Sequence, residues 1–306
     1  MWFPNSGSPW RLAQRGALLL TLAAGCESKP EQVRIPGMEA TGAMSPPGPE
    51  YEATEVLHRQ LAERNPEYDR ERTAFRFEEQ VLTRVELVRA NLKDLTPLAG
   101  NPIYILDLRE NDLLQDLGPL RGLPLHELYL EETAVQDLAP LAGLPLQSLY
   151  LSQTPVADLS PLARCPLAYL NLVGTQVTDL SPLTGLKLDS LWLNETPVRD
   201  ITPLASVPLV SLSLHKTSVD DLASLSRMPS LQRLHVGETA VSDLRPLKNL
   251  RLQRLIFSPG RITEGLDVIR GMESLRELDV ELGSGPRLTP AEFWARYDAG
   301  GFPPAN

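Results

Sequence analysis

Pairs of apolar residues separated by one other residue recur along most of the chain, at a period of 21 to 23 residues. Two side chains two positions apart lie on the same face of a β-strand, and the residue between them faces the other way. Self-similarity at a period of about 20 to 29 residues is typical of a solenoid of stacked repeats. The pattern predicts ten strands, with apolar pairs at Val85/Leu87, Leu106/Leu108, Leu128/Leu130, Leu149/Leu151, Leu170/Leu172, Leu191/Leu193, Leu212/Leu214, Leu234/Val236, Leu255/Phe257 and Leu278/Val280.

An aspartate follows the predicted strands at the same period. Most of these aspartates are followed three residues later by a proline, which presets φ for a helical turn. We expect Thr96, Ser160, Ser181 and Thr202 to act as N-caps and each aspartate to accept backbone N–H groups. The segment is about six residues long, which favours a 3₁₀ or short α turn. Calcium binding is the alternative for these aspartates, which whole repeats separate: Asp94, Asp116, Asp137, Asp158, Asp179, Asp200, Asp221 and Asp243.

The segments that flank the repeats have their own signals. Ala53, Leu57 and Leu61 recur at helical spacing, and residues 75 to 77 alternate as in a strand. At the other end, Thr289 and Glu292 form a capping box for a short helix that carries aromatic residues. We therefore expect an N-terminal cap of a helix plus a strand over 51–80, repeats over 81–282 and a C-terminal cap over 283–306, since open solenoid ends need covering.

The first 25 residues have the features of a targeting segment. Arg11 and Arg15 precede an apolar run of nine residues at 16–24, too short to span a bilayer, which needs about 20. Residues 23–25 before Cys26 resemble a bacterial lipobox, and this resemblance implies a signal peptide over 1–25 and a lipidated Cys26. Glu27, where Asp would mark retention at the inner membrane, resembles the outer-membrane class. The alternatives are an ordinary cleaved signal peptide and a buried stretch with an incidental Cys.

Residues 26–50 are rich in Pro, Gly and charge and have no apolar period, so we expect a disordered tether. The formal net charge of −10 argues against nucleic acid as a partner, because phosphate binding needs a basic face. Cys165 stands where neighbouring repeats carry Leu and is expected to be a small buried hydrophobe. We find no Ser/His/Asp triad, P-loop or HExxH motif, so the sequence predicts neither an enzyme nor a cofactor.

The repeated phrase L-x-x-L-x-L-x-x-T-x-V-x-D-L-x-P-L resembles bacterial leucine-rich repeats of the internalin-like type, most closely at 94–98, 179–183 and 200–204. The resemblance implies an α/β solenoid with a curved parallel β-sheet on the concave face and short 3₁₀ or α turns on the convex face, used for protein recognition. Thr replaces the usual Asn after the strand, and its hydroxyl is expected to bond to loop backbone. These threonines are Thr133, Thr154, Thr175, Thr196, Thr217 and Thr239.

The residue between the two apolar positions of each strand is predicted to line the concave face. Tyr129, Tyr150 and Trp192 occupy this position, and Tyr169 stands one strand position earlier. Exposed aromatic residues in register are what a protein or peptide interface uses, because they bury much area at little cost in rotamer entropy. The alternative is that they stabilise the sheet as cross-strand pairs. We favour a ligand-binding aromatic band.

Two further pairs are candidates on the same face. His215 and His235 lie on adjacent predicted strands, but no carboxylate or third ligand stands at matching positions, so we expect no metal site. Arg233 and Arg254 share a strand position, where they could bind a carboxylate of a partner or remain a solvated pair.

These observations predict a monomeric, non-enzymatic protein of the bacterial cell envelope, anchored by lipid at Cys26, whose concave face binds another protein or a peptide. The alternative is a structural or adhesive envelope component without one specific ligand.

Overall fold

The structure is a computed structural model that describes residues 48–280 and 287–302. The predicted signal peptide, the lipidation site Cys26 and all but the last three residues of the predicted tether lie outside the described residues, as do 283–286 and 303–306 of the predicted C-terminal cap. All described residues belong to one compact unit, which comprises 48–306.

The described residues contain one sheet of eleven strands, arranged side by side in sequence order. The first two strands form an antiparallel hairpin, and every later strand is parallel to the one before it. The ten strands from β2 onward correspond to the ten apolar pairs of the sequence. The strands are β1 (Thr73–Glu78), β2 (Val81–Leu87), β3 (Ile105–Asp107), β4 (Glu127–Tyr129), β5 (Ser148–Tyr150), β6 (Tyr169–Asn171), β7 (Ser190–Trp192), β8 (Ser211–Ser213), β9 (Arg233–Val236), β10 (Arg254–Phe257) and β11 (Glu277–Asp279).

The register of the sheet places equivalent repeat positions beside one another. Leu128, Leu149 and Leu170 are paired in succession across β4, β5 and β6, and all three are completely buried. A shift of one residue would turn this row of leucines to solvent, so the apolar pattern specifies the register strongly. Stacked repeats therefore share one continuous core.

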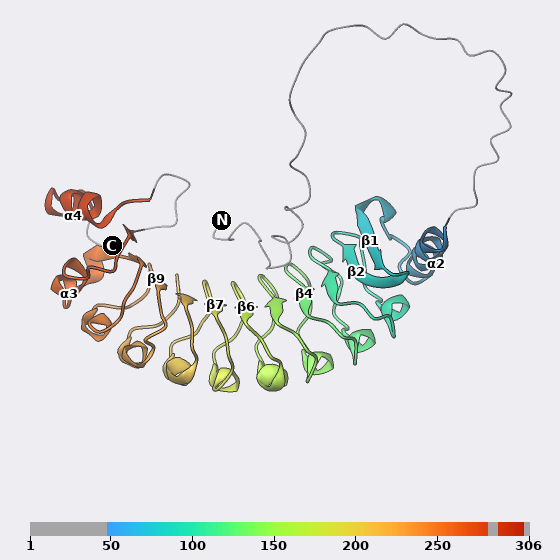
Figure 1. Cartoon of the computed structure of the whole chain (residues 1–306), viewed down its shortest axis with the longest axis horizontal. Coiled ribbons are helices and arrows are strands. Elements are labelled where there is room, and N and C mark those ends of the chain that lie inside the picture. Colours follow the sequence, from blue (N-terminus) through green and yellow to red (C-terminus); the bar gives the residue numbers. More distant parts are fainter. Residues whose placement is uncertain (1–47, 281–286, 303–306) are drawn as a thin grey trace, which may run out of the picture. The chain divides into compact units, whose positions relative to one another are not determined.

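Short 3₁₀ turns connect the strands and form the opposite side of each repeat. Figure 1 shows the strands along the inner edge of the array and the turns along its outer edge. Parallel strands stand about 4.8 Å apart, whereas a helical turn is wider than this, so the array curves with the sheet on its concave face. The turns are η2 (Thr96–Leu98), η3 (Gly118–Leu120), η4 (Ala139–Leu141), η5 (Ser160–Arg164), η6 (Ser181–Leu183), η7 (Thr202–Ser206), η8 (Ala223–Arg227), η9 (Arg245–Leu247) and η10 (Pro259–Arg261).

The aspartates cap these turns, as the sequence predicts. All eight accept a hydrogen bond from the backbone N–H two residues later, at 2.7 to 2.8 Å. The predicted N-caps Thr96, Ser160, Ser181 and Thr202 are wrong, because these residues are the first of their turns and the preceding Leu or Ile holds the N-cap position. The aspartate, one residue before the N-cap, accepts the backbone N–H of the first residue of the turn.

The threonines bond to loop backbone, also as predicted. Each hydroxyl donates to the carbonyl three residues earlier, at 2.6 to 2.8 Å. The residue just before the threonine has positive φ in most repeats, for example 59° at Gln153 and 70° at Gly174. The threonine bond therefore holds a turn that the backbone adopts at some steric cost.

A helix and the β1–β2 hairpin stand at the N-terminal end of the repeats. Helix α2 (Pro49–Arg64) buries Leu57 and Leu61 in the common core. Asn65 follows the helix, and its Oδ1 accepts the backbone N–H groups of Lys93 (2.8 Å) and Asp94 (2.9 Å). These hydrogen bonds connect the end of α2 to the loop that precedes η2.

Two helices stand at the C-terminal end. Helix α3 (Leu266–Arg270) follows η10, and α4 (Pro290–Asp298) begins with the predicted capping box between Thr289 and Glu292. Phe293 of α4 is completely buried against Phe257 of β10, with ring centroids 5.5 Å apart. Within 48–280 and 287–302, no helix is long and apolar enough to cross a membrane.

Candidate binding surface on the concave face

Tyr129 and Tyr150 form a stacked pair at the middle position of β4 and β5. The two residues are paired in register, their ring centroids are 4.7 Å apart and their planes differ by 2°. Both side chains are half-buried. Burial and the neighbouring Glu127 carboxylate raise the pKa of Tyr129, and burial raises the pKa of Tyr150 to about 12, so both rings are neutral near pH 7.

Polar groups hold the Tyr129 ring from two sides. Its hydroxyl donates to Oε2 of Glu127 at 2.9 Å, and the guanidinium of Arg109 lies 5.5 Å from its ring centroid. Arg109 in turn donates two hydrogen bonds to Asp107, at 2.9 and 2.6 Å. Arg109, Tyr129 and Tyr150 therefore form a ladder along three successive repeats, in which a cation–π contact continues a ring stack.

The remaining aromatic residues do not extend this ladder. Trp192 is separated from Tyr150 by Asn171, which pairs with both in the sheet. The prediction of an exposed indole is wrong, because Trp192 is only 8% exposed. Trp192 and Tyr150 share one strand position, so the position in the strand does not decide how far a side chain is covered. Tyr169 is the first residue of β6 and pairs with Ser148 and Ser190, the first residues of β5 and β7. Its side chain is half-buried.

His215 and His235 approach each other as their positions predict. Their rings stack with centroids 4.7 Å apart, and Nδ1 of His215 is 3.0 Å from the carbonyl oxygen of Gly237. A Cβ at Gly237 would lie 2.9 Å from Nε2 of His235, so glycine makes room for the stack. Burial, and then the charge of His215, lowers the pKa of His235 to about 3, which keeps this ring neutral at physiological pH.

A carboxylate lies near these histidines, although it does not stand at a matching strand position. Oε1 of Glu238 lies 3.7 Å from Nε2 of His215, on the loop that follows β9. The repeat period hid this contact, because Glu238 is not at a position equivalent to either histidine. Even so, no three His, Cys, Asp or Glu side chains in the described part of the chain are placed to hold a metal ion.

Arg233 and Arg254 are adjacent in the sheet, but they differ in their partners. The Nε of Arg254 forms an ion pair with Oε2 of Glu277, which also accepts from Arg287 at 2.8 Å. Arg254 is therefore committed to a partner within the fold. Arg233 is half-buried and stays a candidate for a partner carboxylate.

Sequence reasoning missed Glu131, which follows β4 on the concave side. It is 9% exposed, and its Oε2 is buried with no hydrogen-bond partner. Burial raises the pKa of Glu131 to about 7, with smaller opposing contributions from its own backbone N–H and from Arg109. The available signal was an acidic residue at a position where the next two repeats carry Ser152 and Val173. A buried carboxyl group of this kind is a candidate for function.

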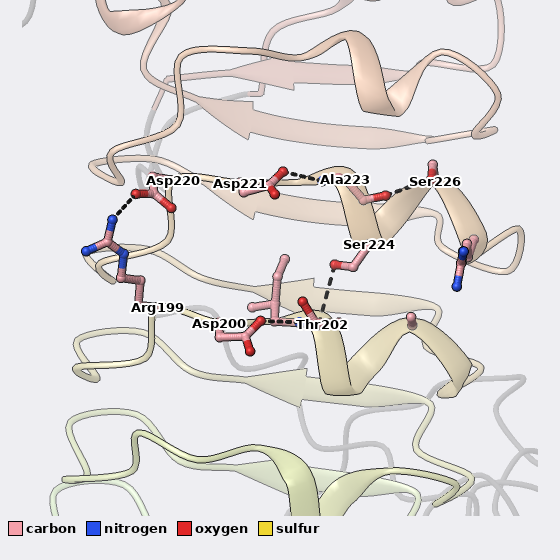
Figure 2. Close-up of a pocket in the computed structure, with 11 residues that line it drawn as sticks. Arg199, Asp200, Thr202, Asp220, Asp221, Ala223, Ser224 and Ser226 are labelled. Atoms are coloured by element: carbon pink, nitrogen blue, oxygen red, sulfur yellow. Dashed lines mark hydrogen bonds and ion pairs between the residues drawn. The ribbon is translucent and has the colours of Figure 1, made fainter.

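The surface hollow between η7 and η8 has a structural role. It encloses about 560 Å³ and includes Arg199, Asp200, Asp220 and Asp221. Figure 2 shows that the charged groups labelled there bind to neighbouring groups of the fold. Arg199 forms an ion pair with Asp220 at 2.6 Å, and both Asp200 and Asp221 accept a backbone N–H of the turn that follows them. The hollow is thus the groove between two adjacent turns.

Comparison with solved structures places the chain among leucine-rich-repeat solenoids. An internalin (inlF) from Listeria monocytogenes is 32% identical, with a TM-score of 0.56, and the match covers 63% of this chain and 59% of that one. An internalin C2 (inlC2) from the same organism is 28% identical, with a TM-score of 0.53 and coverage of 57% and 80%. The chain therefore spans less than two thirds of the first of these internalins.

A plant protein shares the fold at lower identity. The leucine-rich-repeat ectodomain of the membrane receptor kinase GASSHO1/SCHENGEN3 from Arabidopsis thaliana, in complex with CASPARIAN STRIP INTEGRITY FACTOR 2, is 16% identical, with a TM-score of 0.53 and coverage of 74% and 35%. At this identity the likeness concerns the fold alone. No protein-family model matches the chain, and no curated protein matches it.

Proposed function

We propose that this leucine-rich-repeat solenoid is a non-enzymatic protein of the bacterial cell envelope, whose concave face binds another protein or a peptide. The stacked Tyr129–Tyr150 pair carries this proposal. The rings are large, they are oriented by Glu127 and Arg109 before any partner arrives, and they stand on strands and not on a loop. Preorganised aromatic side chains contribute much contact area at little entropic cost, as hot spots of protein interfaces do.

The comparisons support the same proposal at a coarser level. The internalins share the fold at 28% and 32% identity, and the plant ectodomain of the same fold was solved with a bound factor. We further propose that lipidation at Cys26 attaches the protein to the envelope, with the outer membrane favoured. The resemblance of residues 23–26 to a lipobox supports this part.

The test of the binding surface replaces both tyrosines of the pair. A photo-crosslinking aromatic residue in place of the half-buried Tyr150 would capture the partner in cells for identification by mass spectrometry. The variant Tyr129→Ser/Tyr150→Ser should then bind this partner at least about tenfold more weakly, because two hot-spot rings are lost. The affinity is measured by calorimetry on the purified pair.

The matched control is Tyr104→Ser. Tyr104 is 40% exposed and precedes β3, outside the row of middle positions. This variant should keep its affinity within about twofold. An unchanged affinity of the double variant would refute the concave tyrosine surface. Recovery of detergent-resistant multimers of the chain, instead of one stoichiometric partner, would favour the structural or adhesive alternative.

A further inference from the structure

Glu131 is the least satisfied acidic group among the described residues of the concave face. A buried oxygen without a hydrogen-bond partner costs free energy, and native proteins retain few such groups, so each one needs an explanation. The Oε2 atom of Glu131 is one of them, and the Oγ atom of Ser152 is another. The backbone N–H of Glu132 donates to the carbonyl of Ser152 at 2.9 Å, so these two oxygens belong to side chains on adjacent repeats.

The surroundings of Glu131 favour a positive charge. Asp107 on the preceding repeat and Glu132 beside it are acidic, and both disfavour the ionised form of Glu131. Within 48–280 and 287–302, the basic group that acts on Glu131 is Arg109, which donates two hydrogen bonds to Asp107. Tyr129 and Tyr150 add aromatic rings whose hydroxyl groups are neutral. The site therefore has excess acceptor capacity and too little compensating charge.

We propose that Glu131 and Ser152, beside the Tyr129–Tyr150 stack, form a subsite for the ammonium group of a lysine side chain of the partner. This inference rests on the proposed function and specifies the chemistry that the same face recognises. An ammonium group is compact and carries three donors, which suits one carboxylate oxygen, one hydroxyl oxygen and one water molecule. A guanidinium group would need two parallel acceptors from one carboxylate, and Asp107 already supplies that arrangement to Arg109.

Access to the subsite needs only a side-chain rotation. Oε2 itself is covered, but the torsion that turns a carboxyl group about its last bond is broad, so either oxygen can face outward at small cost. The incoming ammonium would stabilise the ionised form of Glu131, because opposite charges attract each other more strongly in a buried site than in water. Occupation of the subsite would therefore be coupled to the release of a proton.

A short peptide tests the subsite without knowledge of the natural partner. The probe is the acetylated and amidated tripeptide of lysine, and its control is the same peptide with every side-chain amine acetylated. The full-length chain, labelled with ¹³C at the glutamate carboxyl groups, is titrated with each peptide. The Glu131 signal is identified by its absence from the spectrum of Glu131→Gln. We expect the lysine peptide, and not its acetylated form, to shift this signal and to lower the apparent pKa of Glu131.

Two isosteric variants separate a specific subsite from general attraction. Glu131→Gln and Glu132→Gln remove the same charge from adjacent residues, but Glu132 is exposed. We expect the first to weaken peptide binding about tenfold and the second by less than about twofold. Thermal unfolding of both variants verifies that they are folded.

The pH dependence supplies an independent readout. The pKa of Glu131 is about 7, so the ionised fraction rises steeply from pH 6 to pH 8. Binding of the lysine peptide should strengthen about tenfold over this range in the native chain and should be nearly flat in Glu131→Gln. Equal weakening by the two variants, or equal binding of the acetylated peptide, would overturn the subsite. Either outcome would leave the tyrosine test of the proposed function unaffected.

Discussion

At the scale of single residues, the position that Thr holds after most strands, here called the slot, shows that a side chain can form hydrogen bonds within one repeat or between two repeats. Asn111 occupies the slot in the second repeat, and its Nδ2 donates to the carbonyls of Leu87 and Leu108 at 2.8 Å each. Its Oδ1 accepts the backbone N–H of Leu92 at 2.9 Å. Thr154 and the other threonines in this slot bond only within their own turn. Asparagine therefore links adjacent repeats, and threonine does not.

This difference predicts unequal costs of substitution. Asn111→Thr should lower the free energy of unfolding by about 2 kcal/mol or more, because a donor at Leu92 and an acceptor at Leu87 lose a buried partner. Thr154→Val should cost only about 1 kcal/mol, since the Leu151 carbonyl keeps a bond from the backbone N–H of Thr154. Chemical denaturation of both variants measures the difference. Equal costs would show that the bonds between repeats contribute nothing.

At the scale of elements, each repeat depends on its neighbours. A three-residue strand and a 3₁₀ turn cannot bury an apolar face alone, so stability comes from stacking and the end faces must be covered. The α4 helix supplies this cover at the C-terminal end through Phe293, which also contacts Trp294 and Phe302, with ring centroids 5.1 and 4.9 Å away. The capping box at Thr289 begins this helix.

Removal of this aromatic contact should destabilise one end of the array more than the other. Phe293→Ala creates a cavity that costs about 3 to 5 kcal/mol. Because repeats interact only with their neighbours, amide hydrogen exchange should accelerate in β10 and β11 and stay unchanged in β4 and β5. Tyr51→Ala on the exposed surface of α2 serves as the control. This variant should leave amide exchange unchanged in β10 and β11 and also in β4 and β5. Uniform acceleration across the sheet would contradict end-fraying and indicate one cooperative unit.

At the scale of the whole molecule, the proposed anchor and the binding face have different requirements. The proposed binding would depend on a rigid curved sheet, whereas the proposed attachment would depend on Cys26, which lies outside the described residues. The formal net charge of −10 is compatible with a partner that presents lysine, because acidic surfaces attract basic ones over distances set by salt.

Attachment has its own test in cells. Cys26→Ala should abolish incorporation of a radiolabelled fatty acid and move the protein from the membrane fraction to a soluble one, because acyl chains supply the anchorage. Cys165→Ala is the control, since Cys165 is buried in the core and burial raises the pKa of its thiol. Absence of label from the wild-type chain would leave an ordinary cleaved signal peptide as the explanation of residues 1–25.

The amino-acid order was sufficient for everything that depends on the period. It predicted the ten repeat strands, the aspartate caps, the contact between Tyr129 and Tyr150 and the approach of His215 to His235. These follow because alternation along a strand and stacking at a constant period place equivalent positions side by side. The local sequence therefore determines which strand position a residue occupies and on which face of the sheet it lies.

Burial and partners on that face were decided by the tertiary structure alone. Trp192 and Tyr150 occupy equivalent positions in the sequence, yet one is almost fully covered and the other half-buried. Glu131 is buried whereas the adjacent Glu132 is exposed, and burial raises the pKa of Glu131 to about 7. Desolvation depends on the curvature of the sheet and on side chains from other repeats, which no periodic pattern encodes.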